Sequence, residues 1–298
     1  MWSNGKKVAV ALSFDFDAES LWFEPFKMST PTPLSRGEYG ARVGVHKVLA
    51  LLDKYRIPAT FFIPAWVAET YPEHCKETAG RGHEIGYHGY YHESVVGMRM
   101  EKERDLMQRG MAVLERITGQ TPQGNRSVPF DLGPNTAKLL QELGYVYDSS
   151  MMGADNPYWV KIDGRESRIV ELPVAWELDD APFFIFSYFP YMSGLWSSDH
   201  VYTIWKQEFD GAYEEDGLFL LTMHPQLIGR RSRLATHFLG LALPVMLAAA
   251  ALASLLLVGL RSHDLKQDKL AWSVKLAQQS AQLLGHSVWN LDKGEIKA

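Results

Sequence analysis

Residues 6–14 read KKVAVALSF, a pair of lysines followed by an apolar run that leads directly into Asp15 and Asp17. A short apolar run with polar residues on either side is typical of a strand buried on both faces. Further along, strand and helix patterns alternate: VHKVLALLDKYR at 45–56, IPATFFIP at 57–64 and HEIGYHG at 83–89. This alternation predicts an α/β fold in which βα units build a parallel sheet or barrel.

The alternation continues to about residue 234 without an internal repeat or a low-complexity linker. We therefore expect residues 1–234 to form one catalytic domain. Strands are expected within RIVELPVAW at 168–176 and GLFLLTMHP at 217–225. Helices are expected around Glu69–Gly80, over Arg99–Thr118, over Pro134–Leu143 and near Val201–Tyr213.

Composition narrows the class of function. With 298 residues, 46% hydrophobic and 22% charged, the chain can form a sizeable core. A net charge of -5 and a pI near 6.1 give no reason to expect nucleic acid as a partner. Cys75 is the single cysteine, which excludes an internal disulfide and fits a reducing, cytoplasmic location. Any metal must therefore be bound by histidine and carboxylate.

Polar side chains stand where the expected strands end. In parallel α/β folds, the groups that act on a substrate gather beyond the carboxyl ends of the strands. Loops are often polar, yet aspartate, histidine and arginine at four strand ends indicate a site. The residues concerned are Asp15, Asp17, His88, His92, Arg126 and His224.

The stretch HEIGYHGYYHE at 83–93 raises the question of a metal. His88 and His92 are four residues apart, so a helical turn or a tight loop brings both to one side, whereas His83 does not fit this spacing. A histidine-rich loop can equally well only pack and form hydrogen bonds. Asp17 supplies a third ligand, and one carboxylate with two imidazoles leaves an open position on a divalent ion, as catalysis requires.

Asp15 precedes Asp17 by two residues and so points to the same side of an extended strand. It can therefore stand beside a metal-bound water as general base. The alternative is a carboxylate that caps a loop. A second carboxylate beside a metal ligand introduces like-charge repulsion, which destabilises the site unless that carboxylate is used. The catalytic role is therefore favoured.

These motifs resemble the polysaccharide deacetylase superfamily, carbohydrate esterase family 4. Asp15-Phe16-Asp17 is similar to the branch that holds cyclic imide hydrolases, peptidoglycan-deacetylase-like proteins and allantoinase-like enzymes, while His88-Gly89-Tyr90-Tyr91-His92 matches the second motif and Leu221-Thr222-Met223-His224-Pro225 the last. The resemblance covers roughly residues 6–234. It implies a distorted (β/α) barrel, one divalent metal ion, expected to be zinc, and a homotetramer.

The resemblance also implies roles for individual residues. Asp15 would be the base, Asp17, His88 and His92 the metal ligands, and His224 the general acid. Arg126 would orient the base or face the substrate, unless it is a surface charge. Trp176 would line the pocket or pack in the core, and Asp180 would bond to the substrate or to His224.

The substrate class follows from the segment after the first motif. Residues 21–40 carry Trp22, Phe23, Phe26 and Tyr39 among prolines, which indicates a lid or pocket wall suited to a small planar ring, or else a subunit contact. We therefore expect metal-dependent hydrolysis of non-peptide C–N bonds, led by ring opening of small cyclic imides. The alternatives are an N-acetyl sugar deacetylase and a binding protein without catalytic activity.

The C-terminal region, residues 235–298, departs from the family pattern. Residues 238–260 form an apolar run without a charged residue, long enough to span a membrane. Pro244, Gly240 and many alanines weaken that interpretation, so a buried or interface helix is favoured over membrane contact. A tail altered by a change of reading frame would produce the same abrupt loss of pattern.

Overall fold

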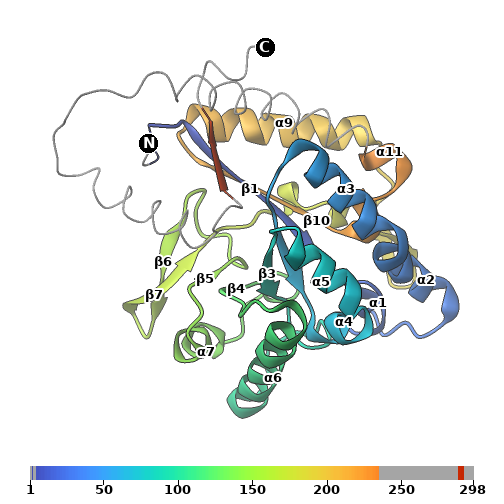
Figure 1. The fold of residues 1–298 in the computed structure, drawn as a ribbon. Coiled ribbons are helices and arrows are strands. Elements are labelled where there is room, and N and C mark those ends of the chain that lie inside the picture. Colours follow the sequence, from blue (N-terminus) through green and yellow to red (C-terminus); the bar gives the residue numbers. More distant parts are fainter. Residues whose placement is uncertain (1, 3–4, 235–287, 292–298) are drawn as a thin grey trace.

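The computed structural model describes residues 2, 5–234 and 288–291, and shows a mixed α/β architecture with a curled sheet and helices packed around it (Figure 1). The main sheet runs in the order β10-β1-β2-β3-β4-β5-β7-β6, and β11 pairs with β1 beside this path. The sheet strands are β1 (Val8–Asp15), β2 (Thr60–Ile63), β3 (Glu84–Tyr87), β4 (Gly124–Asn125), β5 (Tyr147–Asp148), β6 (Tyr158–Ile162), β7 (Arg165–Glu171), β10 (Leu218–Met223) and β11 (Val288–Leu291). A separate hairpin consists of β8 (Phe186–Tyr188) and β9 (Tyr191–Ser193).

Parallel pairing dominates the main sheet. β1 pairs in parallel with both β10 and β2, and the parallel order continues through β3, β4 and β5 to β7, while β6 and β11 pair antiparallel. All eight residues of β1 are buried, as its continuous apolar run predicts. The expected distorted (β/α) barrel is confirmed in the form of a curled half-barrel.

Helices cover the outer face of this sheet (Figure 1). The prediction of one helix around Glu69–Gly80 is wrong in one respect, because two helices meet there. Tyr71 separates them with a φ of -125°, and Pro72 begins the second helix. The segment 21–40 is likewise largely helical. The helices are α1 (Ser20–Phe23), α2 (Pro31–Tyr39), η1 (Gly40–Gly44), α3 (Val45–Tyr55), α4 (Ala65–Thr70), α5 (Pro72–Gly80), α6 (Met100–Thr118), α7 (Thr136–Leu143), η2 (Trp176–Leu178), α8 (Ala181–Phe184), α9 (Ser198–Glu214), α10 (Pro225–Ile228) and α11 (Arg231–Arg233).

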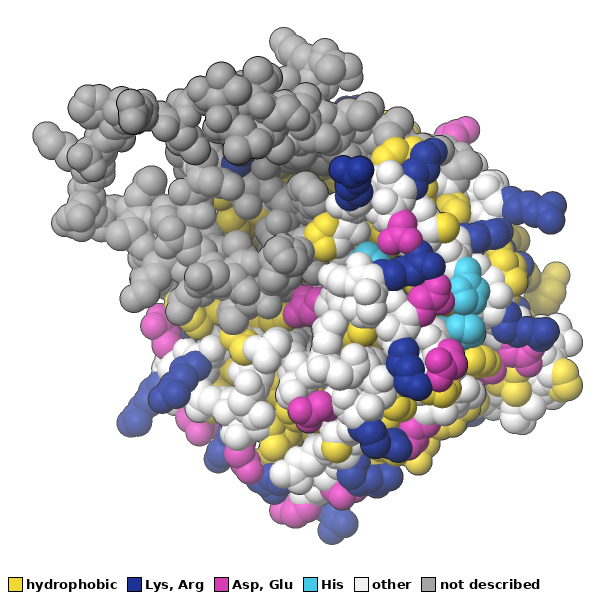
Figure 2. Space-filling model, viewed as in Figure 1, with side chains coloured by type: hydrophobic (Ala, Val, Ile, Leu, Met, Phe, Trp, Pro, Cys, Tyr) yellow, Lys and Arg dark blue, Asp and Glu magenta, His cyan; other side chains and the backbone are white. Residues whose placement is uncertain are grey.

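Charged side chains of both signs are mixed on the face shown in Figure 2. Among the described residues, exposed charged side chains form ion pairs one helical turn apart, as Arg109 does with Asp105 and Lys206 with Asp210. Such exposed pairs add little stability, typically less than about 1 kcal/mol. The mixture on this face agrees with the modest net charge of the chain.

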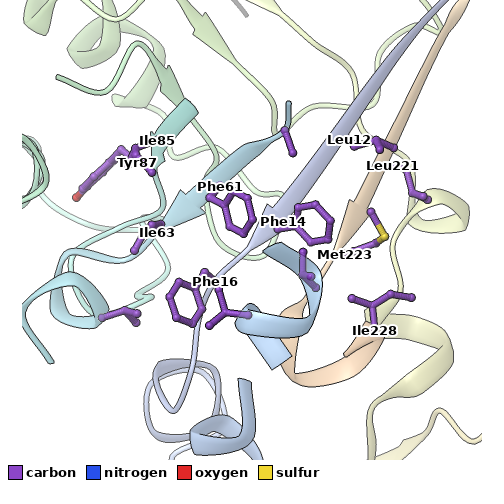
Figure 3. Close-up of a cluster of buried hydrophobic side chains, with 14 of the residues drawn as sticks. Leu12, Phe14, Phe16, Phe61, Ile63, Ile85, Tyr87, Leu221, Met223 and Ile228 are labelled. Carbon is purple, nitrogen blue, oxygen red and sulfur yellow. The ribbon is translucent and has the colours of Figure 1, made fainter. Parts of the chain in front are cut away.

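The core follows from the two-residue period of β1. Val8, Val10, Leu12 and Phe14 pack against the helices, while Ala9 and Ala11 belong to a second cluster inside the curl of the sheet. Figure 3 shows Phe14 beside Phe61 of β2, and their rings stack with centroids 5.0 Å apart. The inner face of β1 therefore continues toward its carboxyl end with Ser13 and Asp15, the first polar groups on that face.

The apolar run 238–260 and most of the C-terminal region lie outside the described residues, so their structure stays a prediction. Within residues 2, 5–234 and 288–291, no helix combines the length and the apolar character needed to cross a bilayer. Val288–Leu291 is the described part of the C-terminal region, and it pairs antiparallel with β1.

Candidate active site

Two aspartates mark the carboxyl end of β1. Asp15 is the last residue of β1, and Asp17 follows in the turn that leads to α1, where Ser20 donates a hydrogen bond from Oγ to the Asp17 carbonyl at 2.7 Å. Both carboxylates are buried. Each has one oxygen 3.6 Å from Nε2 of His88, so the two side chains do converge as predicted.

A tight loop after β3 carries the two histidines. Gly89 and His92 adopt positive φ angles of 78° and 71°, and the Glu93 carboxylate accepts hydrogen bonds from the backbone N–H groups of Tyr90 and Tyr91. The rings of His88 and His92 lie 4.9 Å apart at a steep angle. A tight loop, and not a helical turn, therefore brings His88 and His92 to one side.

Asp17, His88 and His92 form a ligand set whose donor atoms all lie within 4.8 Å of one another. Oδ1 of Asp17 is 3.6 Å from Nε2 of His88 and 3.5 Å from Nε2 of His92, and it has no hydrogen-bond partner among the described residues. Ligand atoms around a tetrahedral zinc ion are about 3.3 Å apart, given bonds of about 2.0 Å. The set thus fits one divalent metal ion.

The electrostatics of these groups agree with that fit. Burial raises the pKa of Asp17 well above its usual range, an effect that a bound cation would offset. Burial, together with His88 and His224, lowers the pKa of His92 well below its usual range, which keeps the imidazole neutral and able to ligate. The ring of His88 is oriented by a contact of 2.7 Å between Nδ1 and the Arg126 carbonyl, so that Nε2 faces Asp17.

His83, by contrast, stays outside the set. Its Nδ1 accepts a hydrogen bond from the Ala59 backbone N–H at 3.3 Å, and its ring contacts Phe61. This buried structural role agrees with the spacing argument.

Arg126 is fully buried, which excludes the surface-charge interpretation. Its Nη1 donates to Oδ1 of Asp15 at 2.7 Å and to Ser13 Oγ at 2.9 Å. Its other nitrogens donate to the carbonyl and hydroxyl oxygens of Ser149, and its Cζ atom lies over the Phe62 ring, 4.1 Å from the centroid. Burial alone would raise the pKa of Asp15, but Arg126, His88 and His224 outweigh burial and lower it, so Asp15 is ionised.

His224 follows β10 and is held by a carboxylate pair. Its Nδ1 lies 2.6 Å from Oδ1 of Asp180 and 3.5 Å from Oδ1 of Asp179. Burial disfavours a charged imidazole, yet Asp179 and Asp180 outweigh it and raise the pKa of His224 well above its usual range. Its Nε2 lies 3.5 Å from Oδ2 of Asp17. Of the two expectations for Asp180, the bond to His224 is the one observed.

A cavity of about 390 Å³ opens above these groups. Trp176 lies at its wall, 43% exposed and in contact with the Phe130 ring, so the core-packing interpretation of Trp176 is wrong. Leu21 and Phe26 also line the cavity, as expected of a pocket wall formed by residues 21–40. The complete lining is Asp15, Leu21, Phe26, His88, His92, Val128, Pro129, Phe130, Trp176, Asp179, Ala181, Pro182, Ile185, Met192, Ser193 and His224.

Sequence reasoning missed two polar contributors. Asp179 contacts His224, and burial raises its pKa to about 7, although its position beside Asp180 in the chain could have drawn attention to it. Gln226 donates from Nε2 to Oδ2 of Asp17 at 3.2 Å. Its only signal was its position two residues after His224, at the start of α10.

Comparison with known proteins shows the family of the chain. The family model described as polysaccharide deacetylase matches residues 36–147. The peptidoglycan deacetylase of Helicobacter pylori is 32% identical over 258 residues, which cover 78% of this chain and 88% of that protein. The chain belongs to the polysaccharide deacetylase family.

Solved structures of similar proteins support the same membership. A Mycobacterium smegmatis protein provisionally classed as a polysaccharide deacetylase is 33% identical, with a TM-score of 0.78 over 90% of this chain and 97% of that one. The PuuE allantoinase structure is 22% identical with a TM-score of 0.70, covering 94% and 92% of the two chains, which shows a shared fold alone. Membership of this deacetylase family agrees with the coarse expectation of a hydrolase of amide-type C–N bonds, and metal dependence fits the ligand set.

Proposed function

We propose that the chain is a metal-dependent deacetylase that hydrolyses the N-acetyl group of an amino sugar in a peptidoglycan-type glycan. This reverses the order favoured by the sequence analysis, where imide opening came first. The reason is that the Helicobacter pylori relative, similar over most of both chains, is a peptidoglycan deacetylase, while the comparisons do not support imide specificity.

One observation carries the chemical part of the proposal: an anionic base and a cationic acid stand at one ligand set and line one cavity. Oδ2 of Asp15 is 3.6 Å from Nε2 of His88, and Nε2 of His224 is 3.5 Å from Oδ2 of Asp17. Asp15 is the last residue of β1, whereas His224 directly follows β10. Amide hydrolysis needs a base and an acid of this kind beside one carbonyl carbon.

Asp17, His88 and His92 would hold the metal ion, and zinc is the ion we propose for this mixed oxygen and nitrogen set. When bound, the ion would supply Lewis acidity toward the acetyl carbonyl and toward water. Gln226 and the Arg126 carbonyl orient Asp17 and His88, respectively, for this role.

Asp15 would accept the proton of the attacking water. Arg126 keeps Asp15 ionised and holds Oδ1, so that Oδ2, which lies toward His88, is the oxygen available to the proton. Because Ser149 and Phe62 contact the same guanidinium, the base is held in one orientation. Such preorganisation removes reorientation from the reaction step.

His224 would donate a proton to the departing nitrogen, since an amine anion is a poor leaving group. Asp180 accepts from Nδ1, which places the transferable proton on Nε2, the ring nitrogen nearest to Asp17. The hydrogen bond from the His224 backbone N–H to Oδ2 of Asp180 fixes the carboxylate as well. The imidazolium is therefore both stabilised and oriented.

The cavity suits an acetamido group attached to a sugar ring. Its walls are mostly apolar side chains, among them Val128, Pro129 and Ile185, against which an acetyl methyl group can pack. Trp176 is partly exposed at the wall and offers a flat surface to the sugar ring.

Cyclic imide opening remains the second candidate, favoured by that same small, apolar cavity. The departing nitrogen of an imide is already acylated and acidic, so the acid would matter less than for an acetamide. The cytoplasmic location and the homotetramer stay predictions under either reading.

The test compares the two substrates on one preparation of the full chain of known metal content. We expect acetate release from an N-acetylglucosamine oligomer, inhibition by a chelator, and no release by Asp15→Asn. Chelator-sensitive opening of succinimide without acetate release would replace the proposal with the imide reading. No reaction with either substrate in metal-loaded protein would contradict both.

A further inference from the structure

A second set of candidate metal ligands lies on the helix layer. It consists of His46 on α3, and His74 and Glu77 on α5, and their donor atoms lie within 4.8 Å of one another. It shares no residue with the candidate active site, and none of the three lines the active-site cavity. Figure 2 shows histidine side chains together on the molecular surface, with acidic and basic side chains beside them.

The local fold explains why these side chains meet. His74 and Glu77 are three residues apart on α5, so both project from the same face of that helix. His46 is the second residue of α3, and its ring lies 4.7 Å from the ring of His74 at 89°. Nδ1 of His46 is 3.4 Å from Oε2 of Glu77, close to the spacing of about 3.3 Å between ligands of a tetrahedral ion.

Neighbouring residues orient two of the three ligands. Arg81 donates from Nη2 to Oε1 of Glu77 at 2.6 Å, which leaves Oε2 turned toward His46. Tyr71 stacks on the ring of His74 with centroids 5.8 Å apart and planes within 16°, and its hydroxyl is bound to Glu19. Such outer contacts hold a ligand in place before the ion arrives.

The residue types and the exposure of this set suit a metal ion. Burial lowers the pKa of His74, and His46 lowers it further. Imidazole nitrogens and one carboxylate are suitable ligands for zinc and similar divalent ions. The side chains of His46 and Glu77 are 42% and 32% exposed, so an ion can enter from solvent and complete its coordination with water.

We propose that His46, His74 and Glu77 form a second, solvent-accessible binding site for a divalent transition metal, which joins α3 to α5. An ion bound there would stabilise the folded chain, because the three ligands converge only in the fold. It would have no direct part in hydrolysis.

The test uses the full chain, stripped of metal with a chelator, and zinc as the probe. In His88→Ala, where the active-site ligand set is broken, we expect about one equivalent of zinc to bind and the melting temperature to rise with zinc. Adding His74→Ala or His46→Ala to that variant should weaken binding at least tenfold and abolish the rise. Adding His200→Ala, which removes an exposed histidine on α9, should change neither.

A second comparison covers the case in which His88→Ala does not fold. Wild-type protein should bind two equivalents of zinc and His74→Ala one, with amide hydrolysis unchanged. Zinc binding that His46→Ala and His74→Ala leave unaltered would overturn the second site. Loss of the tighter equivalent in Asp17→Ala, with the His74-dependent one retained, would separate this site from the proposed active-site metal.

Discussion

Nη1 of Arg126 lies 2.7 Å from Oδ1 of Asp15, and both side chains are buried at the carboxyl end of β1. Ser13 and Ser149 accept the remaining hydrogen bonds of this guanidinium. The arginine therefore sets both the charge and the orientation of the proposed base. A buried pair of this kind is costly to break, because the remaining charge is left without compensation.

Arg126→Gln should accordingly reduce both stability and turnover. Loss of one partner of a buried pair costs about 3–5 kcal/mol in the free energy of unfolding. An unpaired, mispositioned base should lower kcat by roughly 10²-fold or more. Denaturant unfolding and acetate-release kinetics measure the two effects.

The matched control is Arg116→Gln, an arginine whose side chain is 67% exposed beside Glu69. It should change the free energy of unfolding by less than about 1 kcal/mol and leave turnover intact. Equal effects of the two substitutions would contradict the role given to Arg126.

The ligand assignment predicts two classes of variant. Substitution of a ligand removes both the active-site metal and the activity, whereas substitution of the base removes the activity alone. Asp17→Ala and His88→Ala should lose the active-site metal and all turnover, because each removes a donor from a set of three. Asp15→Asn should keep the metal and lose turnover, because the amide cannot accept the proton. The metal content of each purified variant, compared with that of wild type, and its kcat provide the measurement. Turnover by an Asp17→Ala protein that has lost the active-site equivalent would rule out the scheme.

Much of this site was predictable because strand period and strand ends are local properties of the sequence. The alternation in β1 places Asp15 on the inner face, and the four-residue spacing brings His88 to His92. Arg126 and Trp176 were ambiguous, since burial depends on segments distant in the chain. Their positions are decided by Ser149 and Phe130, respectively, which no local pattern connects to them.

Gln226 was missed for a similar reason, because its contact also depends on segments distant in the chain. Gln226 reaches Asp17 across 209 positions of sequence, a contact that arises only because β1 and β10 are neighbours in the sheet. The division of Glu69–Gly80 into α4 and α5 could have been predicted, because Pro72 restricts the residue before it.

Asp180 and Asp179 should differ in their importance to His224. Asp180→Asn removes the carboxylate 2.6 Å from Nδ1, and an asparagine can neither stabilise the imidazolium nor hold the correct tautomer. We expect kcat to fall by roughly 10²–10⁴-fold. Asp179→Asn acts at 3.5 Å and should cost less. Kinetics of the two variants at equal metal content test the order, and a larger loss in Asp179→Asn would reverse our assignment.

Trp176→Ala should weaken substrate binding without unfolding the chain. The indole is 43% exposed, so its removal affects the core little, while the cavity loses a wall. Loss of part of the indole's contact with the substrate should weaken the free energy of binding by about 1 kcal/mol. This corresponds to a roughly fivefold rise in KM with kcat unchanged. Met152→Ala removes an equally exposed apolar side chain outside the cavity and should leave KM as it was.

Glu84 should make the stability of the chain depend on pH. It begins β3 and so lies at the end of that strand opposite the candidate active site. Burial raises its pKa from 4.5 to about 7, despite hydrogen bonds from Thr60 and Tyr147 to the carboxylate. The folded chain then binds a proton that the unfolded chain has released between about pH 4.5 and pH 7. Stability from this group is complete below pH 4.5 and is lost as pH rises through 7, with an upper bound of about 1.4 kcal/mol per pH unit.

Glu84→Gln removes that titration, so its free energy of unfolding relative to wild type should improve between pH 5 and pH 8. Glu166→Gln, the same change at an exposed position of β7, should show no such trend. Urea unfolding of the three proteins at pH 5, 6, 7 and 8 measures the difference. A relative stability of Glu84→Gln that stays flat across this range would mean that the Glu84 carboxylate is better solvated than its position between Thr60 and Tyr147 implies.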